Sequence, residues 1–235
     1  MPIPDKGLVY TGSRDPRPGR EGVQEHSVQI LLGDADLVGD LAVPDDAKAL
    51  VLFAHGSGSS RLSPRNRYVA DILNGTGLAT LLIDLLTVHE DHIDQQTMEF
   101  RFNIGLLAER LMRLTDWHSV HPELSSLPLA YFGASTGSAA ALIAAAGRRS
   151  VRAVVSRGGR PDLAASSLAE VKAPTLLIVG GDDMPVIDLN RQAFDRLRCE
   201  KQLEIVPGAT HLFEEPGALE TVARMAAEWY QRHSG

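Results

Sequence analysis

The sequence has little of several features that mark other classes of protein. Its 235 residues include a single cysteine, Cys199, so no internal disulfide can form. Aromatic residues make up 5% of the chain, and 23 Lys and Arg against 30 Asp and Glu give a net charge of −7, so we expect no nucleic-acid partner. No run approaches the ~20 apolar residues of a membrane span, and residues 1–20 lack the apolar segment of a secretory signal. We therefore expect a cytoplasmic protein with no membrane partner.

Apolar patterning divides the chain into a short beginning and one long domain. Residues 1–24 are polar and rich in Pro and Gly, which predicts a flexible lead-in. From His26 apolar and polar positions alternate up to a turn at Gly33-Asp34, and a second such stretch ends near Val43. This pattern predicts an antiparallel hairpin. We expect residues 25–235 to form a single domain, because a chain of this length can still be organised by one hydrophobic core.

After residue 46, short and wholly apolar runs alternate with longer amphipathic stretches. Runs that are apolar on both faces are typical of a parallel sheet covered by helices on each side. The predicted strands are residues 49–54, 79–83, 127–132, 152–155, 175–179 and 203–206. The predicted helices are residues 66–73, 100–117, 138–146, 184–197 and 218–232. The sequence thus predicts an α/β fold with a mostly parallel sheet, an N-terminal antiparallel hairpin and helices on both faces.

A G-x-S-x-G motif, Gly133-Ala134-Ser135-Thr136-Gly137, lies between the third of these strands and an Ala-rich helix. A nucleophilic serine on a sharp strand-to-helix turn needs such a context, because only small neighbours let the strand and helix approach. A turn that contains serine by chance would look the same locally. The motif and its context weigh about evenly between these two interpretations.

A base and an acid for Ser135 follow at the ends of later strands. Gly180-Gly181-Asp182-Asp183 follows the fifth apolar run, and His211 lies in the loop after the sixth, just before the last helix. An acid and then a histidine is the chain order used by hydrolases with this type of serine. His211 is therefore the predicted base, while local physics leaves Asp182 and Asp183 open as the acid that orients it, the other being a helix N-cap.

The loop after the first parallel strand, His55-Gly56-Ser57-Gly58-Ser59-Ser60-Arg61, is the place expected to supply a second oxyanion donor. We expect the backbone N–H groups of Ser57 and Thr136 to form the oxyanion hole. A dinucleotide-binding loop is the rival interpretation, with Asp84 as its ribose-binding acid. Arg61 stands where that motif needs its third glycine, and cofactor binding would leave Ser135 and His211 without a role. No cofactor is expected.

Together, these segments resemble the dienelactone hydrolase-like group of the α/β-hydrolase superfamily. The resemblance runs from about residue 26 to the C-terminus, and it is strongest to bacterial members that occur alone or fused to a phosphoribosyltransferase domain. It implies hydrolysis of esters, lactones or related acyl bonds without a cofactor. The family pattern G-x-x-D-x-x-V, laid on Gly180, Asp183 and Val186, selects Asp183 as the acid. True dienelactone hydrolases use a cysteine nucleophile, and this chain departs from them by having Ser135.

Two further groups of residues, a pair of histidines and a pair of arginines, have both a functional and a structural interpretation. His89 and His92, with nearby carboxylates, fit a metal site less well than a solvated flap over residues 87–100, so no metal is expected. Arg61 and Arg157 follow strands near the expected mouth of the site and are candidates for binding an acidic substrate group. Pairing with acidic residues of the surface is the structural alternative for both.

The expected protein is a serine hydrolase that cleaves an ester or lactone of a small molecule through an acyl-enzyme on Ser135. The same parts could serve an acyltransferase or a peptidase, or the fold could be kept by a non-catalytic binding module. Only about fifteen residues separate Gly158 from Pro174, the usual place of an inserted lid, so no lid domain is expected.

Overall fold

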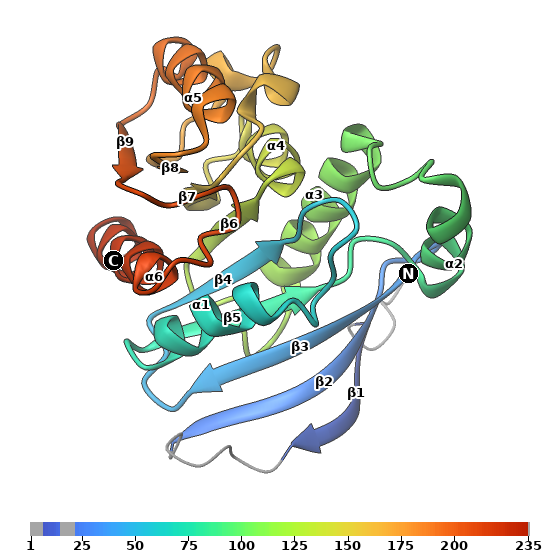
Figure 1. The fold of residues 1–235 in the computed structure, drawn as a ribbon. Coiled ribbons are helices and arrows are strands. Elements are labelled where there is room, and N and C mark those ends of the chain that lie inside the picture. Colours follow the sequence, from blue (N-terminus) through green and yellow to red (C-terminus); the bar gives the residue numbers. More distant parts are fainter. Residues whose placement is uncertain (1–6, 15–21, 235) are drawn as a thin grey trace.

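The computed structural model, which describes residues 7–14 and 22–234, contains a nine-stranded sheet with the order β1-β2-β3-β5-β4-β6-β7-β8-β9 (Figure 1). The strands are β1 (Leu8–Arg14), β2 (Val23–Leu31), β3 (Asp36–Pro44), β4 (Ala49–Ala54), β5 (Leu78–Ile83), β6 (Leu129–Ala134), β7 (Val151–Arg157), β8 (Thr175–Gly180) and β9 (Lys201–Val206). The first three are antiparallel, and the six from β5 to β9 along the sheet are parallel to one another. The predicted hairpin and all six predicted parallel strands are confirmed.

Helices cover both faces of the sheet, as the sequence predicts. They are α1 (Pro64–Asn74), α2 (Val88–Thr97), α3 (Ile104–Val120), α4 (Thr136–Ala145), α5 (Met184–Arg196) and α6 (Ala218–His233). α1 and α6 pack side by side on one face, while α3 and α4 pack on the other (Figure 1). The strands β4, β5, β6 and β8 are buried along their whole length, because apolar side chains point into both of these layers. None of the helices among the described residues is long and apolar enough to cross a membrane.

The beginning of the chain differs from the flexible lead-in expected for residues 1–24. Residues 8–14 form β1, which pairs with β2 at the edge of the sheet. Tyr10 packs edge-on against the ring of His26, at 4.9 Å between ring centroids, and Leu8 contacts the core. Sheet pairing thus overrides the Pro- and Gly-rich composition around this short segment. The rest of the expected lead-in, residues 1–6 and 15–21, lies outside the described residues.

The expected flap over residues 87–100 is largely a helix, α2. The side chain of Thr87 accepts a hydrogen bond from the N–H of Glu90, and the Glu90 carboxylate accepts one from the N–H of Thr87. This reciprocal capping box satisfies two N–H groups that a helix start leaves unpaired. The spacing of Thr87 and Glu90 is thus the sequence signal for the start of α2. Hydrophobic periodicity gives no such signal, because Asp94 is the only buried residue of this helix.

The link between β7 and β8 contains two short 3₁₀ turns, η1 (Pro161–Ala164) and η2 (Leu168–Glu170), and no inserted domain. The carboxyl ends of the parallel strands are therefore not covered by a lid from this position. Because β4 and β6 are neighbours with Ala54 opposite Gly133, the loops that follow the two strands are brought together at that edge.

Candidate active site

Ser135 lies on the sharp turn between β6 and α4 with φ +51° and ψ −123°. Few side-chain-bearing residues adopt a positive φ, and such strain persists only where the surroundings enforce it. Gly137 is one of the enforcing positions, because a Cβ atom there would overlap the carbonyl oxygens of Ala54 and His55. Gly137 therefore lets α4 start close to β4, and Gly133 lets the backbone of Ser138 pack against the end of β6.

The structure brings Ser135, His211 and Asp183 together. The Nε2 atom of His211 lies 3.3 Å from Oγ of Ser135, and its Nδ1 atom lies 2.6 Å from Oδ2 of Asp183. The side chain of Asp183 is 13% exposed and that of His211 is 36% exposed, so the acid is shielded while the imidazole can reach a substrate. Asp182 is exposed. Asp183 occupies the N-cap position of α5, but its side chain contacts the histidine and does not cap the helix.

The loop after β4 is fixed by the buried side chain of His55. Its Nδ1 atom lies 3.0 Å from the carbonyl oxygen of Gly56, and its Nε2 atom accepts a hydrogen bond from the N–H of Leu85 at 3.1 Å. One ring nitrogen thus donates and the other accepts. His55 therefore holds the loop after β4 to the loop after β5. No motif in the sequence marks His55 for this role.

The expected pair of oxyanion donors has an unexpected arrangement. Thr136 is the first residue of α4, so its N–H has no acceptor within the helix and is free to bind a substrate oxygen. The N–H of Ser57, however, donates to Oγ1 of Thr136 at 2.8 Å. The Ser57 N–H is thus directed at the threonine hydroxyl, next to the N–H of Thr136. An oxyanion hole made of these two backbone N–H groups stays a prediction.

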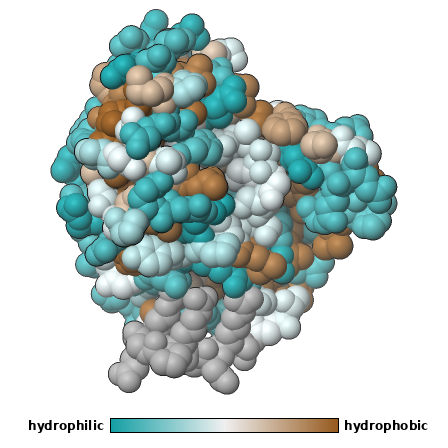
Figure 2. Space-filling view, viewed as in Figure 1, coloured by the Kyte–Doolittle hydropathy of each residue, from teal (hydrophilic) through white to brown (hydrophobic). Residues whose placement is uncertain are grey.

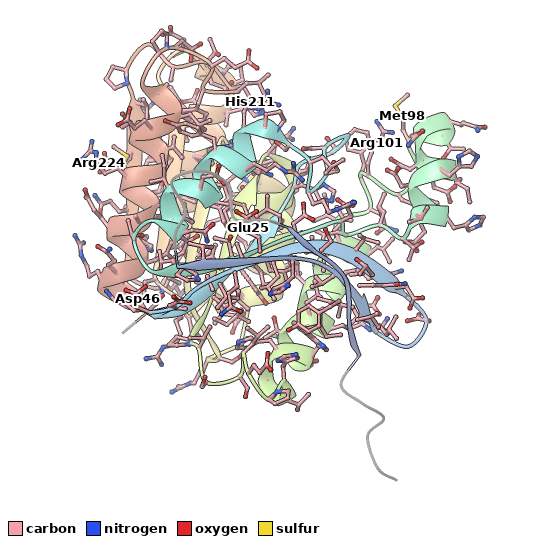
Figure 3. All side chains as sticks on the ribbon, turned by 90° about the horizontal axis from the view of Figure 1, so that it is seen from below. Glu25, Asp46, Met98, Arg101, His211 and Arg224 are labelled. Atoms are coloured by element: carbon pink, nitrogen blue, oxygen red, sulfur yellow. The ribbon has the colours of Figure 1, made fainter. Side chains whose placement is uncertain are left out.

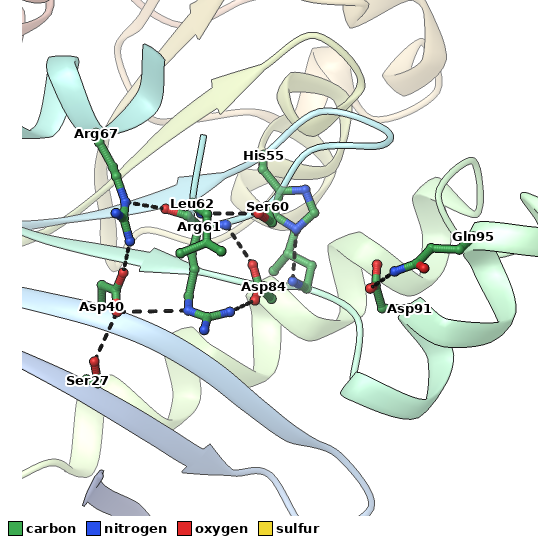
Figure 4. A network of polar contacts seen from close by, with 11 residues as sticks. Ser27, Asp40, His55, Ser60, Arg61, Leu62, Arg67, Asp84, Asp91 and Gln95 are labelled. Atoms are coloured by element: carbon green, nitrogen blue, oxygen red, sulfur yellow. Dashed lines mark hydrogen bonds and ion pairs between the residues drawn. The ribbon is translucent and has the colours of Figure 1, made fainter. Parts of the chain in front are cut away.

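Arg61 is held in a network of acidic partners (Figure 4). Its backbone N–H donates to Oδ1 of Asp84 at 2.6 Å, its Nη1 contacts the other oxygen of that carboxylate, and its Nε lies 3.9 Å from Asp40. Arg67 completes the network by donating to Asp40 and to the carbonyl oxygen of Arg61. This arrangement is the structural alternative weighed above, and it leaves Asp84 engaged with the protein itself and not presented to a ribose.

Arg157 is buried at the end of β7 with 6% of its surface exposed. Its Nε and Nη1 atoms are buried and lack a hydrogen-bond partner among the described residues. Burial, together with the nearby charge of Arg65, lowers the pKa of Arg157 to about 10. Its backbone has a clear role, because its carbonyl oxygen accepts from the N–H of Ser135 at 3.1 Å. Its side chain is not presented at the mouth, where sequence analysis expected it to meet an acidic substrate group.

A cavity of about 390 Å³ lies against the loop after β4, between it and the α2–α3 corner. Its lining is about half polar and half apolar: polar side chains include Ser57, Ser59, Asp91, Gln95 and Arg101, and Leu86 and Leu107 are its large apolar side chains. The lobe at the right of Figure 2, formed by α2, is mainly hydrophilic. The cavity is thus suited to a small or polar group next to the Ser57 loop.

One wall of this cavity is fixed by a buried ion pair. The Nε atom of Arg101 donates to Oδ2 of Asp94 at 2.6 Å, and both oxygens of Asp94 are engaged, since Oδ1 accepts from the N–H groups of Phe100 and Arg101. Burial alone would raise the pKa of Asp94, but these hydrogen bonds outweigh it and hold that pKa below its usual value. Arg101 lies with Met98 at the corner where α2 ends (Figure 3), and its Nη1 atom adjoins Gly58 of the β4 loop. No sequence motif marks this pair.

The remaining candidates lie away from Ser135. His89 and His92 are exposed on α2. Among residues 7–14 and 22–234 no group of three or more His, Cys, Asp or Glu side chains is arranged to hold a metal ion. Cys199 is half-buried beside Thr175, and burial raises the pKa of its thiol, so it lacks the environment of a reactive thiolate.

Comparison with known proteins agrees with this fold. The model of the dienelactone hydrolase family matches residues 39–234. A solved dienelactone hydrolase from Anabaena variabilis is 57% identical, with a TM-score of 0.90 over 92% of this chain and 100% of that one. A cold-adapted esterase from an Arctic intertidal metagenomic library is 16% identical, with a TM-score of 0.72 over 95% of this chain and 98% of its own, and it shares the fold.

Curated relatives add a second observation. Two Mycobacterium tuberculosis proteins, each named "Putative phosphoribosyl transferase", are 54% identical to this chain over 212 residues. The match covers 90% of this chain and 47% of each relative, so the chain spans about half the length of these proteins. The family model, the Anabaena structure and the mostly parallel sheet agree with one another: this chain belongs to the dienelactone hydrolase family and has its α/β-hydrolase fold.

Proposed function

We propose that this protein is a serine hydrolase that cleaves a carboxylic ester or lactone of a small molecule through an acyl-enzyme on Ser135. The observation that carries the proposal is the continuous line of contacts from Asp183 through His211 to Ser135, at 2.6 and 3.3 Å. A hydroxyl alone is a poor nucleophile at neutral pH and needs such a base. Membership of the dienelactone hydrolase family supports the ester or lactone class.

The first step of the proposed reaction makes the acyl-enzyme. His211 takes the proton of the Ser135 hydroxyl through Nε2 as the serine oxygen attacks the acyl carbon. Asp183 accepts a hydrogen bond from the Nδ1 proton, which fixes the ring in the orientation that leaves Nε2 free as the base. The charge that develops on the carbonyl oxygen is met by donors at the start of α4. His211 then gives its proton to the leaving alcohol.

The second step repeats the first with water as the nucleophile. His211 takes a proton from water, the hydroxide attacks the acyl carbon, and Ser135 leaves with the proton returned by His211. For a lactone the alcohol stays attached to the acyl group, so the product is a single hydroxy acid. A serine in place of the family's cysteine makes dependence on His211 stronger, because a thiol is already partly ionised at neutral pH and a hydroxyl is not.

Phosphoribosyl transfer is not part of the proposed function. The two relatives with that name are about twice as long as the region that matches, and the matched region corresponds to most of this chain. The catalytic residues proposed for this chain, Ser135, His211 and Asp183, are suited to acyl transfer and hydrolysis.

Replacement of the nucleophile tests the proposal. Ser135→Ala should lower turnover of p-nitrophenyl acetate and of a small lactone by about 10⁴–10⁶ while the far-UV circular dichroism stays unchanged. A fluorophosphonate probe should label the wild type at Ser135 and leave Ser135→Ala unlabelled. Labelling without ester or lactone hydrolysis would favour an acyltransferase or a peptidase, and absence of both labelling and hydrolysis would favour a non-catalytic binding module.

A further inference from the structure

The hydroxyl of Thr136 is a polar group that the mechanism above does not use. It belongs to the residue directly after the nucleophile, and Thr136 is 5% exposed. Its Oγ1 atom accepts the N–H of Ser57 at 2.8 Å, although the two residues are 79 positions apart in the chain. The contact ties the β4 loop to the first residue of α4, the two segments from which oxyanion donors are expected.

The proton of this hydroxyl has no acceptor among residues 7–14 and 22–234. The contact with Ser57 uses an oxygen lone pair, because a backbone N–H can only donate. A hydroxyl carries one proton to donate as well, and a buried donor left without a partner costs about 1–3 kcal/mol. The proton is therefore available to an acceptor that lies outside the described residues, such as an oxygen atom of a substrate.

The same residue presents a second donor at this place. Thr136 is the first residue of α4, so its own N–H has no acceptor in the helix and lies at the positive end of the helix dipole. The N–H and the O–H of one residue are separated by two carbon atoms, so they can converge on one oxygen. The Ser57 N–H, by contrast, already has its acceptor.

We propose that the oxyanion hole of this protein is formed by the backbone N–H and the side-chain hydroxyl of Thr136, with the Ser57 N–H acting through that hydroxyl. This inference rests on the proposed function, since it needs Ser135 to attack an acyl carbon. The Ser57 N–H polarises the hydroxyl, because a hydroxyl that accepts a hydrogen bond becomes a better donor. It also fixes the rotation of the Thr136 side chain, so the donor is in place before charge develops.

The hydroxyl gives up no proton in this step. As the Ser135 oxygen bonds to the acyl carbon, the carbonyl π electrons move to its oxygen, which takes a negative charge and accepts hydrogen bonds from the N–H and O–H of Thr136. The serine proton goes to Nε2 of His211. When the tetrahedral intermediate collapses, the carbonyl re-forms, and the leaving alcohol takes the proton from His211. The hydroxyl therefore contacts the reacting oxygen and is a catalytic group.

Two substitutions at Thr136 separate the hydroxyl from the shape of the side chain. Thr136→Val keeps the branched shape and the backbone N–H but removes the hydroxyl, while Thr136→Ser keeps the hydroxyl. Loss of one oxyanion donor lowers kcat by about 10²–10³-fold in other hydrolases, so Thr136→Val should show a fall of that order with KM within about threefold. Thr136→Ser should stay within about tenfold of wild-type kcat. Thr221→Val, the same change in the first turn of α6, is the matched control and should leave kcat unaltered.

A transition-state analogue distinguishes donation from a structural role. A trifluoromethyl ketone matched to the substrate forms an adduct with Ser135 that carries an oxyanion, so its affinity should fall in Thr136→Val by about the same factor as kcat/KM. A neutral competitive inhibitor that forms no adduct should bind the wild type and Thr136→Val equally. Circular dichroism and thermal unfolding check that each variant is folded, and Thr136→Ser supplies the rescue if the valine variant is not.

Each outcome bears on the inference. Wild-type or higher kcat in folded Thr136→Val would overturn it, because the Ser57 N–H would then be the direct donor and the hydroxyl its competitor. Equal losses in Thr136→Val and Thr136→Ser, or equal loss of affinity for both inhibitors, would overturn it in favour of a structural role. Absence of hydrolysis and of Ser135 labelling in the wild type would overturn the proposed function and this inference with it.

Discussion

The Nδ1 atom of His211 lies 2.6 Å from Oδ2 of Asp183, while the adjacent Asp182 is exposed. Two neighbouring carboxylates therefore differ in which one can orient the imidazole. Asp183→Asn should lower kcat by about 10⁴, because an amide can favour the wrong tautomer of the histidine. Asp182→Asn is the matched control, and we expect less than about a tenfold loss. Steady-state kinetics on p-nitrophenyl acetate measures both, and a larger loss in the Asp182 variant would contradict the assignment.

Arg61 should contribute to the stability of the protein through the loop after β4, and it should not contribute to selectivity for acidic substrates. Its bonds to Asp84 and Asp40 occupy the guanidinium that sequence analysis offered to an acidic substrate. The side chain is 25% exposed, and exposed pairs contribute little, so Arg61→Gln should lower the free energy of unfolding by about 1 kcal/mol. Urea unfolding measures this change.

Substrate selectivity gives the second measurement on Arg61. The ratio of kcat/KM for an ester with a free carboxylate to that for a neutral ester of equal size should be the same in wild type and Arg61→Gln. A tenfold fall in that ratio would show that Arg61 binds the acidic group. Arg224→Gln, which alters an exposed ion pair with Glu228 on α6, is the control for loss of one positive charge.

Arg157→Met should stabilise the fold. Burial and the charge of Arg65 disfavour the charged guanidinium, as the lowered pKa of about 10 reflects, and each pKa unit corresponds to about 1.4 kcal/mol. Met keeps an unbranched apolar stem without the charge, so we expect the free energy of unfolding to rise by about 1–3 kcal/mol at pH 7. A loss of stability in urea unfolding would show that the buried guanidinium has an acceptor of its own.

The pH dependence of this gain has a defined sign. A basic group whose pKa is lower in the folded state binds fewer protons there than in the unfolded chain. Arg157 therefore lowers the free energy of unfolding by its full amount below pH 10, and this destabilisation disappears as pH rises from about 10 towards the ordinary pKa of 12.5. The advantage of Arg157→Met over the wild type should therefore narrow above pH 10. Unfolding of both proteins at pH 7 and pH 10.5 tests this.

The triad residues could be predicted from the sequence, because their places follow from the order of the strands along the chain. Ser135, Asp183 and His211 each follow a strand, and parallel strands end at one edge, so the fold alone brings them near one another. The side-chain roles of His55 and Thr136 could not be foreseen, because each rests on a contact with a residue from another loop, Leu85 and Ser57. β1 was missed for a related reason. It is a strand because β2 offers it an edge, and nothing within the segment itself requires that.

Substrate length is the last property that the structure predicts. The link from β7 to β8 carries only η1 and η2, so no inserted domain has to open at a lipid interface. The cavity beside the Ser57 loop is about 390 Å³, and Leu86 and Leu107 are its large apolar lining residues. A longer acyl chain would soon extend past these two side chains into solvent, and each CH₂ left unburied forgoes ~0.8 kcal/mol. We therefore expect rates with p-nitrophenyl acetate and butyrate to exceed those with octanoate and palmitate.

The test of this expectation turns on α2, because it is the element that could lengthen the pocket. Its end is held by the pair of Arg101 and Asp94, and its exposed large apolar side chains, Val88 and Met98, lie at its two ends and do not form one continuous face. The hydrolysis rate of each ester should then depend only on the concentration of its monomer and show no jump where micelles form. Asp94→Asn would loosen the pair without changing its shape, and if α2 is only a wall it should leave the order of chain lengths as it is. A jump in rate at micelle formation, or a preference for palmitate in the wild type, would instead require α2 to move over the site and present an apolar surface.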